Sequence, residues 1–173
     1  MMNNSELSIF QGTWELVSSH AINSEIEILH EDDEAPDDAI SGWLNDDGRS
    51  LLPLVQPAQG LRMEIHADGF SEQCTGDAQV MWFDAEGCLS DTVQPFSGRC
   101  TLVGSTAYLR PETMASWAMP QDNQHGNALL RYDDGDTQIC DRLTQDGDRL
   151  LRSVNVVTDG LYLNRVIMVY ARN

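Results

Sequence analysis

The stretch Phe10-Gln11-Gly12-Thr13-Trp14-Glu15-Leu16 decides how the rest of the chain is interpreted. Its glycine, two residues before a tryptophan, opens a strand-like run that extends to His20. At the other end, residues 161–172 form a long apolar run that finishes in Arg172. A guanidinium packed over an indole ring gains about 1 kcal/mol when both are desolvated. We therefore expect the two chain ends to meet, with Arg172, or as second choice Arg165, against Trp14.

Short alternating runs fill the sequence between these ends, and almost no helical period separates them. Asp-Gly turns over residues 133–136, 145–148 and 158–160 are strong hairpin signals. About ten antiparallel strands are therefore predicted for one all-β domain over residues 1–173, which is compatible with a sandwich or an up-and-down barrel. A short helical turn within residues 5–11 would plug one end of a barrel.

Residues 31–59 interrupt this rhythm with acidic residues and three prolines. A segment of this length without a strand period is typical of a functional loop or a lid. Residues 37–44 are compatible with a short helix. The apolar residues after it are expected to fold back over a barrel mouth, and they are Trp43, Leu44, Leu51, Leu52, Leu54 and Val55.

The charge of the chain is strongly acidic, with a formal net charge of -18 and no lysine. The acidity is concentrated in residues 1–98, where 19 acids meet two arginines, and it is nearly balanced in residues 99–173, with nine acids and eight arginines. This composition disfavours nucleic-acid binding and excludes Schiff-base chemistry on lysine. It indicates a solvated acidic surface or a docking patch for a basic partner.

Metal, membrane and export signals are missing from the sequence. The four cysteines are widely spaced, without a CxxC pair, so we expect free thiols and no metal site. No apolar run is long enough to cross a bilayer, and residues 1–6 show no signal-peptide pattern. The sequence thus predicts a cytoplasmic protein that does not bind membranes, and it leaves a homodimer open.

A family resemblance favours the barrel over the sandwich. Gly12-Thr13-Trp14 resembles the Gly-x-Trp motif of the lipocalin and fatty-acid-binding (calycin) superfamily, and residues 12–18 look like the opening of bacterial lipocalin-like domains of unassigned function. In that superfamily the tryptophan closes one barrel end under an arginine from the last part of the barrel. The resemblance implies an up-and-down barrel of about 8–10 strands, in which Gly12, Trp14 and Arg172 form the closure.

Two further likenesses concern the ligand. Val169-Tyr170-Ala171-Arg172 is similar to the last strand of fatty-acid-binding proteins, where an arginine and a tyrosine hold the ligand carboxylate. Tyr170 matches that tyrosine, but Met168 stands where the arginine is expected. A weaker likeness, carried by residues 60–63, 141–142 and 150–153, is to lipocalin-shaped bilin lyases. A tetrapyrrole or a fatty acid is therefore a candidate ligand, while no cofactor is identified.

Candidate ligand-binding residues follow from the strand period if Trp14 points inward. That face of the first strand would also hold Leu16, Ser18 and His20, and that of the last strand would hold Tyr162, Asn164, Val166, Met168 and Tyr170. Such a mixed face suits a wet cavity. The alternative is that the opposite face fills the core, because a shift of one residue exchanges the two.

Two arginines and two tryptophans complete the candidate set, and His20 has a second possible role. Arg142 and Arg152 lie in adjacent predicted strands, where they would recognise a carboxylate if both point inward, or pair with surface aspartates if they do not. Trp82 and Trp117 would line a pocket for a flat ligand, or fill an ordinary core. His20 is a candidate haem ligand or general base, although the four histidines show no metal spacing.

The function predicted from these residues is binding of a small apolar or amphipathic molecule inside the barrel. One alternative is an enzyme in the same barrel, namely an isomerase, cyclase or bilin-lyase-like protein, and no catalytic residue is assigned. A second alternative is an acidic protein-interaction module.

Overall fold

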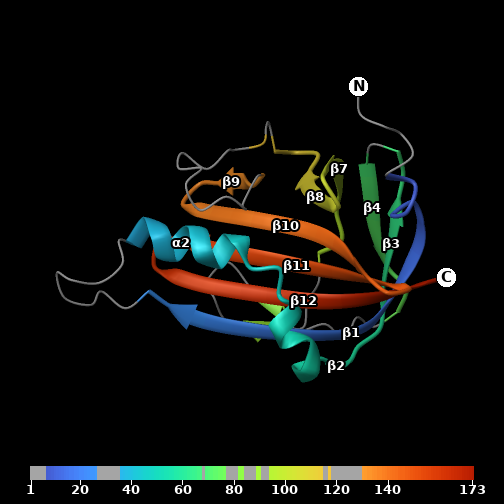
Figure 1. Ribbon diagram of the computed structural model, residues 1–173, viewed down its shortest axis with the longest axis horizontal. Coiled ribbons are helices and arrows are strands. Elements are labelled where there is room, and N and C mark those ends of the chain that lie inside the picture. Colours follow the sequence, from blue (N-terminus) through green and yellow to red (C-terminus); the bar gives the residue numbers. More distant parts are fainter. Residues whose placement is uncertain are drawn as a thin grey trace.

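The structure, a computed structural model, describes residues 7–26, 36–67, 69–76, 82–83, 89–90, 94–114, 117 and 130–173, and within these residues eight strands close into an antiparallel barrel (Figure 1). The order around the barrel is β1-β3-β4-β7-β8-β10-β11-β12, and β12 pairs with β1. This confirms the predicted all-β barrel. The strands are β1 Gly12–Glu25, β3 Leu61–Ile65, β4 Gly69–Cys74, β7 Ser97–Val103, β8 Thr106–Pro111, β10 Thr137–Asp146, β11 Arg149–Thr158 and β12 Tyr162–Arg172.

Smaller elements surround the barrel. Strand β2 (Gln56–Pro57) pairs with β1, β9 (Tyr132–Asp134) pairs with β10, and β5 (Trp82–Phe83) pairs with β6 (Leu89–Ser90) in a separate sheet. Helix α2 (Pro36–Asn45) and the 3-10 helix η1 (Arg49–Leu54) lie between β1 and β2 in the chain. No helix in the described ranges is both long and apolar enough to cross a membrane.

The two chain ends meet at one end of the barrel. Trp14 stands opposite Arg172 in the β1–β12 register, and the guanidinium carbon lies 4.3 Å from the centre of the indole ring. Arg172 also donates hydrogen bonds to the carbonyls of Gln11 at 2.7 Å and Ile9 at 2.8 Å. The stacking pair that the sequence predicts is thus present. Arg165, the second choice, lies over Trp43 instead, at 4.0 Å.

The turn before β1 fills this closed end. Leu7 and Phe10 are buried with the interior side chains, and Nε1 of Trp14 donates to the Phe10 carbonyl at 2.8 Å. Gly12 is required at the start of the strand, since its φ is +129° and a Cβ there would lie 2.7 Å from Nη1 of Arg172. The predicted plug therefore closes the barrel beside the chain ends.

The barrel interior is a continuous apolar cluster that receives side chains from strands all around the ring. Because neighbouring residues of a strand face opposite sides of the sheet, this cluster identifies the inner face of each strand. Its buried members are Leu7, Phe10, Trp14, Leu16, Ala58, Leu61, Met63, Ile65, Phe70, Cys100, Ala107, Leu109, Leu143, Leu150, Val154, Val166, Met168 and Tyr170.

A second layer covers the outer face of strands β8, β10, β11 and β12. Leu44 and Trp43 of α2 pack with Val157 and Leu163, while Leu51 and Leu52 of η1 pack on Ile167 and neighbouring outer residues. Figure 1 shows α2 lying along β10 and β11. The described part of segment 31–59 thus contains the expected short helix, but its apolar residues pack on the outer wall of the barrel and not over a mouth as predicted. Its role as a lid remains a prediction.

Strand β1 contains a β-bulge that changes which of its residues point into the barrel. The pairing with β12 shifts between Leu16 and Ser18, so that Ser19 and Ala21, rather than Ser18 and His20, continue the inner face. The strand predicted from the sequence ends at His20, whereas the strand in the structure continues to Glu25. The inward direction predicted for Ser18 and His20 is therefore wrong, because the extra residue reverses the alternation.

Candidate functional site

A buried arginine on the inner wall of the barrel is the centre of the candidate site. Arg152, in β11, is completely buried, and it forms a bidentate pair with Asp141 of β10: Nε donates to Oδ1 at 2.9 Å and Nη2 donates to Oδ2 at 2.7 Å. Its Nη1 donates to Oε1 of Glu72 in β4. The three side chains come from three strands and join opposite sides of the barrel.

The network contains more acid than base. The side chains of Asp141 and Glu72 are only 1% and 3% exposed, so neither carboxylate is compensated by bulk water. Burial raises the pKa of Glu72, and the nearby Asp141 adds to this, although Arg152 opposes it. Burial alone would lower the pKa of Arg152, but Asp141 and Glu72 outweigh it and the pKa is raised. Arg152 is thus a fixed cation, while Glu72 is the carboxyl that most readily holds a proton.

Neutral polar side chains line the same region. Burial raises the pKa of the Tyr170 and Tyr132 hydroxyls, and it raises the pKa of the Cys100 thiol to about 12. These groups therefore stay uncharged at neutral pH. Phe96 adds an aromatic face, with its ring centre 5.7 Å from the guanidinium carbon of Arg152. The inner wall thus offers one cation, one carboxylate, one protonatable carboxyl and neutral hydrogen-bonding groups within an apolar shell.

The candidate residues of the last strand differ in burial: one at its start is exposed and those further along are buried. Met168 and Tyr170 are buried in the interior cluster, where the Tyr170 hydroxyl lies 3.5 Å from the sulfur of Met168. Asn164 is buried on the same inner face, opposite Val156 in the register. Tyr162 begins the strand and is 44% exposed. The structure therefore brings Met168 and Tyr170 to the interior with Arg152, and it leaves Tyr162 at the surface.

Arg142 and Arg152 lie on opposite faces of the sheet. Arg142 pairs with Ser153 and Arg152 pairs with Leu143 in the β10–β11 register, so the two arginines cannot share an inward ligand site. The alternative expectation of surface ion pairs is also wrong for Arg152, because its pair with Asp141 is buried. The reason is the two-residue turn at residues 147–148, which fixes the register of the hairpin.

On the outer face, Arg142 binds the end of a helix instead of an acid. Its Nη2 donates to the carbonyl of Leu44, the next-to-last residue of α2, and Asn155 donates to the same carbonyl at 3.1 Å. Arg165 donates to the neighbouring Trp43 carbonyl at 2.8 Å. Because α2 has no basic residue in its last turn, these sheet side chains satisfy its terminal carbonyls and complement its dipole.

Neither His20 nor Trp117 lines the interior of the barrel. His20 is half-buried on the outer face, opposite Ile167. Trp117 packs with the outer layer, and its ring centre lies 5.3 Å from the guanidinium carbon of Arg110. Trp82 belongs to β5, and its side chain lies outside the described residues. In the described part of the chain no cluster of three metal-ligating side chains occurs.

Sequence reasoning missed Glu72, Asp141 and Tyr132 as site residues. Glu72 stands two residues after Phe70 in a strand, which is a signal that both point to the same face. Asp141 belongs to the residues that carry the weak likeness to bilin lyases, but it is not predicted as a ligand-binding residue. The pattern that identifies Glu72 is an acidic residue two positions from a buried aromatic residue in the same strand.

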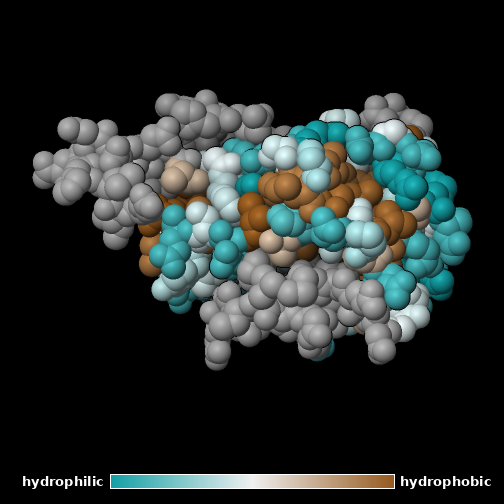
Figure 2. Space-filling model, turned by 90° about the horizontal axis from the view of Figure 1, so that it is seen from below, coloured by the Kyte–Doolittle hydropathy of each residue, from teal (hydrophilic) through white to brown (hydrophobic). Residues whose placement is uncertain are grey.

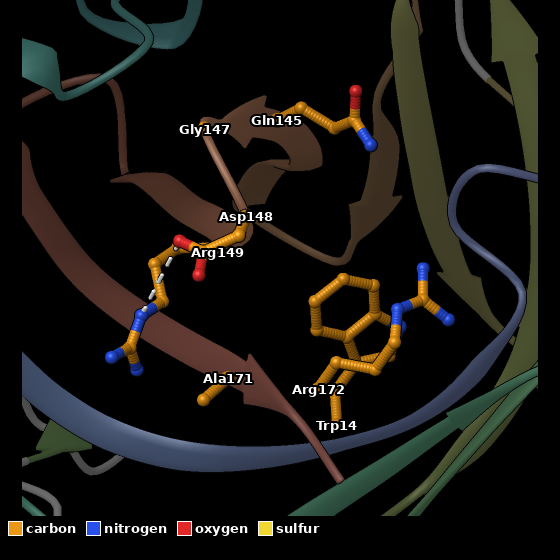
Figure 3. A pocket seen from close by; sticks show the side chains of 7 residues that line it. All are labelled: Trp14, Gln145, Gly147, Asp148, Arg149, Ala171 and Arg172. Atoms are coloured by element: carbon orange, nitrogen blue, oxygen red, sulfur yellow. Dashed lines mark ion pairs between the residues drawn. The ribbon is translucent and has the colours of Figure 1, made fainter.

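A pocket of about 400 Å³ lies at the closed end of the barrel, separate from this network (Figure 3). Trp14 and Arg172 form one side, and the β10–β11 turn with Asp148 and Arg149 forms the other. Figure 3 shows the two guanidinium groups pointing away from each other, and Arg149 faces Asp148 at 3.8 Å. The charged groups of this pocket do not converge, so we place the candidate site on the inner wall.

Comparisons with known proteins add little to this geometry. No family model and no curated protein matches the chain. Among solved structures, the chain is similar to an S-type phycobiliprotein lyase from Guillardia theta, with 13% identity over 98% of this chain and 91% of the other, and a TM-score of 0.37. A likeness this distant assigns neither a family nor a function.

Proposed function

We propose that this protein binds a small amphipathic molecule inside the barrel, with the apolar body of the ligand against the inner wall and its polar group at Glu72. The observation that carries the proposal is the buried network of Arg152, Asp141 and Glu72. It lies in a cluster that is otherwise almost wholly apolar.

Stability does not account for such a network. Removing ionised groups from water costs several kcal/mol per ion, and replacing a buried ion pair with apolar residues is often neutral or stabilising. Here the cost is increased because two acids share one arginine, and burial leaves the pKa of Glu72 raised. Groups that are expensive to bury and perturbed in pKa are typical of functional sites.

The charges of the network favour one class of ligand. A ligand carboxylate would meet two resident carboxylates, and each nitrogen of the Arg152 guanidinium already donates to one of them. A cationic or N–H-donating group would instead be attracted to Glu72 and Asp141. We therefore favour amphipathic amines or tetrapyrroles, whose pyrrole N–H groups are donors, over fatty acids.

The test begins with the visible spectrum and native mass of protein purified from its own source, where a bound chromophore or excess mass identifies the ligand class. Thermal shifts then compare dodecylamine with dodecanoate, which differ only in the polar group, and with a free tetrapyrrole. We expect the amine or the tetrapyrrole to stabilise the protein and the fatty acid not to do so. Glu72→Gln should abolish the shift, while Glu64→Gln, on the outer face of β3, should keep it.

An unchanged native mass and spectrum, together with no thermal shift from any of these compounds, would contradict the proposal. Equal shifts in Glu72→Gln and Glu64→Gln would contradict the location, since the ligand would then be attracted only by the overall acidity of the chain.

An enzyme in the same barrel is the second candidate, and the raised pKa of Glu72 favours it. A buried carboxyl whose pKa is raised, beside a fixed cation, suits general acid–base catalysis, as an isomerase or cyclase would require. The distinguishing result would be turnover of a bound compound that Glu72→Gln abolishes while binding persists.

A further inference from the structure

The 3-10 helix η1 presents apolar side chains that the protein does not bury. None of its six residues is buried, and Leu54 is 50% exposed. Together with Val55 it forms the apolar run Leu51-Leu52-Pro53-Leu54-Val55. Figure 1 shows η1 projecting from the barrel below β12, and Figure 2, seen from that side, shows apolar surface in its middle.

The barrel wall accounts for only part of this run. Leu51, Leu52 and Val55 pack against outer residues of β11 and β12, whereas Leu54 is not part of that cluster. A soluble protein gains nothing from exposing a large apolar side chain within a continuous apolar surface, and such surfaces commonly mark interaction sites. The exposed side of η1 is therefore a candidate docking surface, which we call the η1 surface: Leu51, Leu52, Leu54 and Val55.

Acidic side chains border the η1 surface. Asp46 and Asp47 directly precede η1, and Asp146 binds Arg49 at its start at 3.3 Å. All three aspartates are about half-exposed, and Arg49 pairs with both Asp47 and Asp146. Asp46 also pairs with Arg165 at 3.4 Å, so three acids meet two arginines beside the apolar run, in a chain of net charge -18.

This charge limits what the surface can bind. A second copy of the chain would bring another -18 to the interface, and nucleic acid or an anionic membrane would also be repelled. A basic partner would gain from the same field, which also speeds association. We propose that the η1 surface docks a basic, amphipathic segment of another protein, whose apolar side chains cover Leu54 and its neighbours while lysine or arginine side chains meet the bordering aspartates. This docking does not depend on a ligand in the barrel.

The experiment measures binding of a fluorescent synthetic helix made of leucine and lysine, with the leucines on one face, by anisotropy at physiological salt. A scrambled peptide of the same composition and a leucine–glutamate helix are the controls for amphipathic shape and charge. Leu54→Ser should weaken binding about tenfold. Ile9→Ser, which removes an apolar side chain that is 40% exposed at the closed end, should leave it unchanged.

A second variant tests the charges without touching the apolar run. Asp47→Asn should weaken binding at low salt, whereas Asp133→Asn, an exposed acid outside the η1 surface, should have less effect. Both leucine and isoleucine variants should keep the thermal stability of the parent, because neither residue is buried.

The proposal is overturned if Leu54→Ser and Ile9→Ser bind the peptide equally, or if the scrambled peptide binds as tightly as the amphipathic one. It is also overturned if sedimentation shows a dimer that Leu54→Ser dissociates, since the surface would then belong to a second copy of the chain.

Discussion

Arginines on the two faces of the same hairpin are satisfied in different ways. On the inner face Arg152 is paired with two carboxylates, and on the outer face Arg142 donates to the end of a helix. Both side chains are buried. The outer arrangement holds a structural layer in place, because it satisfies carbonyls that α2 cannot satisfy itself. The inner arrangement buries more charge than the fold needs, which is why we assign function to it.

The largest expected effect comes from removing the inner cation. Arg152→Met would leave Asp141 and Glu72 buried without a partner, which costs about 3–5 kcal/mol of unfolding free energy. Chemical denaturation measures this loss. Arg149→Met, on the same strand but exposed, is the matched control and should change stability by at most about 0.5 kcal/mol. Similar values for the two variants would show that the inner network is not buried as described.

The outer arginine should matter less. Arg142→Met removes donors to neutral groups, and Asn155 still donates to the Leu44 carbonyl, so we expect a loss of about 1–3 kcal/mol. Hydrogen exchange should show the loss as faster opening at the end of α2. A loss as large as that of Arg152→Met would remove the distinction between the two faces.

The pH dependence of the unfolding free energy should also distinguish the inner face of the hairpin from its outer face. The pKa of Glu72 is raised on folding, so between its unfolded and folded pKa the native state binds more protons than the unfolded state. Its contribution to stability is therefore present below the unfolded pKa and is lost as pH rises through the folded pKa, by at most about 1.4 kcal/mol per pH unit.

Denaturation of wild type and Glu72→Gln across this pH range checks the sign. The unfolding free energy of wild type should fall relative to that of Glu72→Gln as pH rises. A difference that grows in the opposite direction would mean that Glu72 is stabilised as a carboxylate.

The smallest effect is expected at His20, which the bulge turns to the outer face. His20→Ala should change the unfolding free energy by at most about 0.5 kcal/mol and leave ligand binding unaltered. Leu16→Ala, which empties an inner position just before the bulge, should cost about 2–5 kcal/mol. A comparable loss for both variants would place His20 inside the barrel.

These contrasts also show how far the sequence predicts the molecule. Gly12, Trp14 and Arg172 predict the barrel and its closed end through their resemblance to a known closure motif, in which the stacking of arginine on tryptophan depends on residue type. The Asp-Gly turns predict the last hairpins because their signal is local. The bulge after Leu16 is not predicted, since residues 16–18 give no local signal for an extra residue, and Ser18 and His20 of the same strand are therefore assigned to the wrong face.

The site itself was only half predictable. Arg152, Met168 and Tyr170 were candidates, but Glu72 reaches Arg152 across the barrel and shares no local pattern with it. The faces of Arg142 and Arg152 follow from the turn: when residues 147–148 form a two-residue turn, Asp146 pairs with Arg149 and Arg142 must face Ser153. Nothing in the sequence shows that α2 covers the outer face, which makes both sides of the sheet buried.

The protonation of Glu72 distinguishes a ligand site on the inner wall from a purely structural ion pair. Carbon-13 NMR of the glutamate side-chain carboxyl groups, followed over pH, measures it directly. We predict that the pKa of the Glu72 carboxyl lies above that of an ordinary glutamate side chain, and that its signal moves when the ligand found in the thermal-shift panel is added. If Glu72 titrates as an ordinary glutamate and does not respond to that ligand, the inner network is a structural ion pair and the proposed site is wrong.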